Sequence, residues 1–142
     1  MSEYSTQPSH DSQNTHEAAL IELASRVFDT ARRGDLEGLR AFLEAGIPVN
    51  MTNDNGDTLL MLAAYHGHPE VVELLCAHGA DVDRRNDRDQ APLAGAVFKG
   101  EDTVVRILVD HGADAHAGTP TAAQTARMFG HQHLLALWPP HD

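Results

Sequence analysis

The chain has 142 residues, a formal net charge of −11 with histidine neutral, and a single cysteine, Cys76. This length suits one domain with a sizeable core. The acidic balance argues against nucleic acid as a partner, because phosphate backbones would be repelled. One cysteine excludes an internal disulfide framework, and no apolar run is long enough for a membrane span. The first residues do not follow the pattern of a secretory signal, so we expect a cytoplasmic protein.

Residues 1–16 are almost entirely polar and cannot bury enough apolar surface to offset the entropy of ordering, which predicts a disordered N-terminal tail. From Glu17 onwards, apolar residues recur at spacings of three and four, as in an amphipathic helix. This helix should end in a basic last turn before Gly34, and a second helix should run from Leu36 to Leu43 and stop at Gly46. Residues 17–50 therefore form a first helix pair.

Residues 53–83 contain two apolar helical stretches with Gly67 at the turn between them. Thr58 is placed to cap the first helix through its hydroxyl group. Pro69 should open the second helix, where its missing N–H costs nothing. We therefore predict a second helix pair.

The same pattern returns 33 residues later, over residues 86–116. Leu60 corresponds to Leu93, and Gly67 corresponds to Gly100. A fixed period of this size indicates a protein built from stacked repeats. Two positions depart from the preceding repeat, because Asp89 replaces a turn glycine and Gly95 replaces an apolar helix residue. A glycine inside a helix is unfavourable, so we expect this repeat to be the least stable.

A shortened fourth copy covers residues 119–140. Thr121 corresponds to Thr58, and Gly130 corresponds to Gly67 with three residues fewer between the copies. Pro139 and Pro140 should end the last helix, because proline lacks the N–H that a helix needs. Residues 141–142 are left as a short tail.

The repeated residues resemble those of the ankyrin repeat family. The family pattern is matched by the segments Thr58–Leu60, Ala63–Ala64, Gly67–His68, Val71–Leu75 and Gly79–Asp81. The resemblance implies an all-α ankyrin repeat solenoid of about four helix-turn-helix repeats joined by hairpin-like turns. It also implies a non-catalytic module that binds other proteins, as an adaptor, a scaffold or a regulator of its partner.

In ankyrin-like stacks, the turn tips and the residues just before the inter-helix glycine line a concave groove. The corresponding tip residues here are Asp54, Asn55, Asp57, Asp87, Arg88 and Gln90. The corresponding helix residues are Arg32 and Arg33, Tyr65 and His66, Phe98 and Lys99, and Met128 and Phe129. Large apolar residues at solvent-facing positions mark partner sites. We expect a protein partner with a basic rim and an apolar anchor, no cofactor, and a monomeric chain.

The alternative is a metal-dependent enzyme or metal-binding regulator that uses some of the ten histidines. His66 and His68 are two residues apart, as are His131 and His133, and residues at this spacing point to different sides of a helix. Zinc needs three or four converging ligands, so we favour structural roles for these side chains and predict no catalytic residues. We interpret Cys76 as a small buried apolar group.

Overall fold

The structure is a computed structural model that describes the backbone of residues 7–138 and the side chains of residues 15–138. Residues 1–6 of the expected tail and the final residues 139–142, with the two prolines expected to end the last helix, lie outside these described residues.

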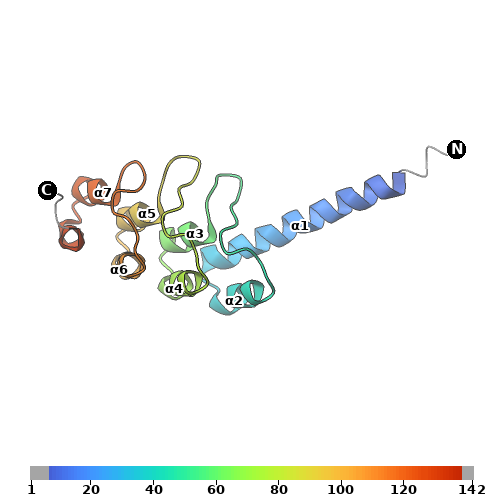
Figure 1. Ribbon diagram of the computed structural model, residues 1–142, viewed down its shortest axis with the longest axis horizontal. Coiled ribbons are helices and arrows are strands. Elements are labelled where there is room, and N and C mark those ends of the chain that lie inside the picture. Colours follow the sequence, from blue (N-terminus) through green and yellow to red (C-terminus); the bar gives the residue numbers. More distant parts are fainter. Residues whose placement is uncertain (1–6, 139–142) are drawn as a thin grey trace.

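The helices form two parallel rows (Figure 1). The inner row consists of α1 (Gln7–Arg33), α3 (Leu59–Tyr65), α5 (Pro92–Lys99) and α7 (Ala122–Met128). The outer row consists of α2 (Leu36–Glu44), α4 (Pro69–Ala77), α6 (Asp102–Asp110) and the 3₁₀ helix η2 (Gln132–Leu137). Each helix packs against its partner in the other row, and the α-helices also pack against their neighbours in the same row. Between residues 7 and 138 there is no strand, so the predicted all-α solenoid of four repeats is confirmed.

Buried aliphatic side chains form one continuous core between the two rows. The same positions are buried in both complete repeats: Leu60 and Leu93 are each 1% exposed, and Leu75 and Leu108 are fully buried. Each helix pair therefore hides its apolar face against the next pair, as the 33-residue period predicted.

The helix starts predicted at Thr58 and Pro69 are also confirmed. Thr58 caps α3 because its Oγ1 accepts a hydrogen bond from the N–H of Met61 at 3.1 Å. Thr121 and Gln124 form a reciprocal capping box at the start of α7. Pro69 opens α4, where proline is well tolerated.

Long turns with hairpin-like ends connect the repeats on one side of the stack (Figure 1). In the first complete turn, the side-chain oxygen of Asn53 accepts hydrogen bonds from the N–H groups of Asn55 and Asp57. Asn86, 33 residues later, accepts in the same way from Arg88 and Gln90. Asparagine thus fixes both turns through local bonds to the backbone.

Neighbouring turn tips are hydrogen-bonded to one another. The N–H of Asp87 donates to the carbonyl oxygen of Asn55 at 3.0 Å, and the N–H of Thr119 donates to that of Asp89 at 2.8 Å. Asp89 has a φ of 60°, so it takes the left-handed conformation that the sequence indicated for this glycine position. Its carboxylate also accepts a hydrogen bond from the hydroxyl of Thr119 at 2.6 Å.

The first helix differs from the sequence-based expectation, because it begins at Gln7 and not at Glu17. Residues 7–16, expected to belong to a disordered tail, are helical, and the helix projects away from the stack (Figure 1). The prediction considered only how much apolar surface these residues could bury. Adding a residue to an existing helix needs far less stabilisation than starting one, so the packed end of α1 supports its extension.

Candidate functional site

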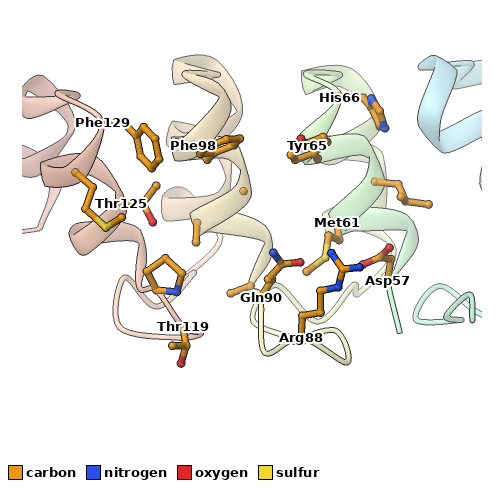
Figure 2. A pocket seen from close by; sticks show the side chains of 16 residues that line it. Asp57, Met61, Tyr65, His66, Arg88, Gln90, Phe98, Thr119, Thr125 and Phe129 are labelled. Carbon is orange, nitrogen blue, oxygen red and sulfur yellow. The ribbon is translucent and has the colours of Figure 1, made fainter. Parts of the chain in front are cut away.

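A groove of about 560 Å³ runs along the inner row over α3, α5 and α7. Figure 2 shows Tyr65, Phe98 and Phe129 following one another along its upper edge, with Arg88 and Gln90 at the turns below. The volume lies within the range of about 300–1,000 Å³ that is typical of ligand-binding clefts.

Four large apolar side chains around the groove face solvent. Tyr65 is 38% exposed, Phe98 45%, Phe129 49% and Met128 65%. The rings of Phe98 and Phe129 meet edge to face, with their centroids 4.9 Å apart. Exposed aromatic residues gathered in a cleft are typical of the energetic centre of a protein interface.

Gly95 opens the groove between Tyr65 and Phe98. It lies in α5, and a Cβ atom built on it would meet only Cδ1 of Tyr65, at 3.7 Å. Leu62 occupies the same position in the preceding repeat and is buried. The missing side chain therefore adds depth to the groove at the place where two aromatic rings face solvent.

The structure brings together eight of the residues that the sequence predicted for this site. They are Asp57, Tyr65, His66, Arg88, Gln90, Phe98, Met128 and Phe129. Six other predicted residues lie outside the groove lining: Arg32, Arg33, Asp54, Asn55, Asp87 and Lys99. The eight side chains thus come from three consecutive repeats.

The lining also includes residues that sequence reasoning missed. Met61 and Ala94 form part of its floor, and Thr119, Pro120 and Thr125 belong to the fourth repeat. Gly95 was identified only as a source of weakness in the helix. Its position one helical turn before Phe98, on the same face, was the available signal that α5 presents a hollow there.

Two cationic side chains, Lys99 and Arg32, lie near His66 at the end of the groove, and Arg32 is also paired with Asp29 at 2.8 Å. Nζ of Lys99 lies 4.9 Å from the ring centroid of Tyr65, which is a cation–π contact. The pKa of His66 is lowered, first by burial and then by repulsion from His68, Lys99 and Arg32. The lowered pKa of His66 favours the neutral imidazole at pH 7.

Several histidines join neighbouring repeats. Nε2 of His68 donates to the carbonyl oxygen of Arg32 at 2.6 Å, which satisfies an acceptor at the end of α1. On the outer row, His111 contacts Glu73 and His133 contacts Asp102, each at 2.8 Å. These contacts give the histidines structural roles between repeats.

Metal binding finds no support in the described structure. Among residues 15–138, no three His, Cys, Asp or Glu side chains gather where they could hold a metal ion. Cys76 is half-buried, and burial, followed by the nearby charge of Glu73, raises the pKa of its thiol to about 11. This thiol is almost entirely protonated at neutral pH and is a weak nucleophile.

Within the described residues, no helix is both long enough and apolar enough to cross a membrane.

Comparison with known proteins identifies relatives of the repeated segment. A family model for ankyrin repeats in three copies matches residues 27–119, more than half of the chain. An ankyrin repeat protein of Pseudomonas aeruginosa is 47% identical over 53 residues, which cover 37% of this chain and 31% of that protein. Human ankyrin repeat domain-containing protein 29 is 44% identical over 59 residues, which cover 41% of this chain and 20% of that protein. The chain therefore spans less than a third of the length of these two relatives.

The fold has a solved counterpart in the crystal structure of the human ASB11 ankyrin repeat domain. The two structures superpose with a TM-score of 0.69 at 27% sequence identity, over 78% of this chain and 52% of the other. The two rows of helices, the 33-residue recurrence and the family match over residues 27–119 all agree, and this chain belongs to the ankyrin repeat family.

Proposed function

We propose that this chain is a non-catalytic protein-binding module, acting as an adaptor, a scaffold or a regulator, whose partner docks in the groove over α3, α5 and α7. Ankyrin repeats generally mediate contacts between proteins through the extended concave face of the stack. The observation that carries the proposal is the row of solvent-facing aromatic residues at Tyr65, Phe98 and Phe129 around one groove.

The partner would present an apolar side chain to the hollow beside Gly95, where Tyr65 and Phe98 form the walls. Burying such an anchor between aromatic rings supplies most of the binding energy in interfaces of this kind. Basic groups of the partner would face the turn tips, because Asp57 and Asp87 lie on that side. The net charge of −11 also disfavours nucleic acid as the partner.

Two threonine hydroxyls in the lining support a non-catalytic role. Oγ1 of Thr125 donates to the carbonyl oxygen of Thr121 at 2.8 Å, and Oγ1 of Thr119 donates to the carboxylate of Asp89. The backbone carbonyl bonded to Thr125 cannot act as a general base, and the Asp89 carboxylate bonded to Thr119 is also paired with Arg85, whose Nη1 lies 3.4 Å from Oδ1. Both hydroxyls are engaged in structural contacts within the turns and helices.

The test is capture of partners from native lysate by the wild-type chain and by a Tyr65→Ala/Phe98→Ala variant. Removing two anchor residues should cost about 2 kcal/mol or more of binding free energy, which is roughly a 30-fold loss of affinity. A Thr103→Ala/Arg106→Ala variant is the matched control, because both residues are exposed on the outer helix α6. Equal recovery of every partner by all three proteins would rule out the groove as the binding site.

The proposal includes a cytoplasmic location, which fractionation of cells that express the tagged chain tests directly.

A further inference from the structure

One position of the inner helices differs between the three repeats that form the groove. Leu62 in α3, Gly95 in α5 and Thr125 in α7 each lie four residues after the N-cap of their helix, so they are equivalent. Leu62 is 8% exposed and Thr125 is 2% exposed, so both side chains fill the space beneath the groove. Gly95 has no side chain and is partly exposed. Space that is filled in α3 and α7 is therefore left open in α5.

The aromatic residues above this position are unevenly spaced. The rings of Phe98 and Phe129 are in contact, with their centroids 4.9 Å apart. The ring of Tyr65 contacts His66 instead of Phe98, and Figure 2 shows it apart from the other two rings. A Cβ atom on Gly95 would lie 3.7 Å from Cδ1 of Tyr65, and Phe98 follows one turn later on the same face of α5. The opening above Gly95 is therefore bounded by one aromatic ring on each side.

The spacing of the packed helices sets the width of this opening. Neighbouring helices lie about 8–10 Å apart, and Tyr65 and Phe98 hold equivalent positions, so their side chains are separated by about the same distance. A ring placed midway would have its centroid about 4–5 Å from each wall, close to the separation of about 4.5–7 Å that aromatic pairs adopt. The opening therefore favours a flat aromatic side chain over a branched aliphatic one.

Lys99 disfavours a cation in the opening. Its Nζ atom lies 4.9 Å from the ring centroid of Tyr65, so this wall already holds a positive charge. A second ammonium or guanidinium group between Tyr65 and Phe98 would be repelled at short range. The side chain that fits between the two rings is therefore an uncharged ring.

The turn tips beside α3 and α5 carry a net negative charge. Residues 53–57 and 86–90 contain four carboxylates and one guanidinium, that of Arg88. One carboxylate, that of Asp89, is paired with Arg85 at 3.4 Å. The other three have no ion-pair partner among the described residues, so three carboxylates face one guanidinium. A partner segment that lies against these tips is therefore favoured when it is basic.

We propose that Gly95 determines the specificity of the groove by admitting an aromatic side chain of the partner between Tyr65 and Phe98. A basic residue of the same partner segment faces the net negative turn tips. This inference rests on the proposed function and specifies the partner as a protein segment in which an aromatic residue lies close to a lysine or arginine. Every wall of the opening comes from one chain, so the proposal keeps the monomer expected from the sequence.

Selection of random peptides displayed on phage tests the proposal without a known partner. The immobilised full chain should enrich peptides in which phenylalanine, tyrosine or tryptophan lies close to lysine or arginine. The Gly95→Leu protein should not enrich them, because leucine fills the opening as Leu62 fills the equivalent position of α3. Thr103→Leu is the matched control, because it adds the same side chain at an exposed position of the outer helix α6.

Fluorescence anisotropy with an enriched peptide then measures the affinities. The wild-type and Thr103→Leu proteins should bind the peptide equally, and Gly95→Leu should bind it about tenfold or more weakly. Gly95→Ala should fall between them, because it adds one methyl group to the opening. Replacing the basic residue of the peptide by glutamate should also weaken binding, and salt should reduce that difference. Circular dichroism verifies that each variant keeps its helices.

Three outcomes would overturn the proposal: enrichment of aliphatic or acidic peptides, equal binding by Gly95→Leu, or no peptide that the wild-type chain binds better than the Tyr65→Ala/Phe98→Ala protein does. The capture experiment separates these failures from failure of the proposed function. If Gly95→Leu recovers every partner that the Tyr65→Ala/Phe98→Ala protein loses, the groove binds a partner but Gly95 does not select its anchor.

Discussion

The two complete repeats, α3 with α4 and α5 with α6, share one backbone design and differ at a few informative positions. Their core positions are equivalent and equally buried, as Leu75 and Leu108 show. They differ where Leu62 is replaced by Gly95 in the groove and where the capping residue Thr58 is replaced by Ala91. Core residues thus maintain the stacking, and the helix starts and groove positions distinguish one repeat from the next.

The largest expected effect comes from the shared core. Leu75→Ala and Leu108→Ala should each lower the free energy of unfolding by about 2–5 kcal/mol, because each leaves a cavity at a fully buried site. Chemical denaturation monitored by circular dichroism measures both losses. If either variant unfolds at the wild-type denaturant concentration, the claim that both repeats depend equally on this position is wrong.

Gly95 inside α5 and Gly100 at its C-cap should respond to substitution with opposite signs. Gly100 has a φ of 71°, so Gly100→Ala forces alanine into the left-handed region and should cost about 1–2 kcal/mol. Gly95→Ala should raise the free energy of unfolding by about 0.5–1 kcal/mol, because the added methyl group meets only Tyr65 at ordinary contact distance. Thermal melts of the two variants should shift in opposite directions. A lower melting temperature for Gly95→Ala would show that the helix requires glycine there.

The helix α5 has no side-chain cap, because Ala91 stands where Thr58 caps α3. This difference suggests a test with a smaller expected effect on stability. Thr58→Val keeps the shape of the side chain but removes the oxygen that binds the N–H of Met61, and it should cost about 1 kcal/mol. Thr58→Ser keeps that oxygen and is the matched control. Denaturation curves should separate the two variants. Equal stability would mean that α3, like α5, needs no side-chain cap.

The smallest effect concerns Cys76, which corresponds to Val109 in the following repeat. Since burial raises the pKa of its thiol from the ordinary value of 9.0 to about 11, alkylation at pH 8 should be about 100-fold slower than for a free thiol of ordinary pKa. Folding favours the protonated thiol, so its contribution to stability is present below about pH 9 and is lost as the pH rises towards 11. Cys76→Val should remove this part of the pH dependence, and rapid labelling would contradict burial of the thiol.

The sequence was sufficient to predict the repeat architecture because the information is local and periodic. Thr58 and Pro69 specify helix starts through their own chemistry, and both starts were predicted correctly; Thr121, which aligns with Thr58, caps α7 in the same way. The shape of the groove could not be predicted from the sequence in this way, because it depends on which side chains of different helices lie next to one another. Tyr65 and Phe98 could be assigned to one face from the family pattern, but the hollow depends on a missing side chain in a different helix from Tyr65.

The first helix shows another limit of sequence reasoning. The polar composition of residues 7–16 argues against burial, and a segment that does not pack was interpreted as disordered. The structure has these residues as a continuation of α1, where helical hydrogen bonds replace tertiary contacts. Composition predicts whether a segment is buried more reliably than it predicts local backbone conformation.

The backbone hydrogen bonds between successive turn tips, from Asp87 to Asn55 and from Thr119 to Asp89, have a mechanical consequence. Neighbouring repeats are tied together both at their helices and at their outermost loops, so they resist being spread apart or squeezed together one at a time. A partner that docks across neighbouring repeats therefore meets a surface whose width is already fixed. It must match that width, and little ordering entropy is lost when it does.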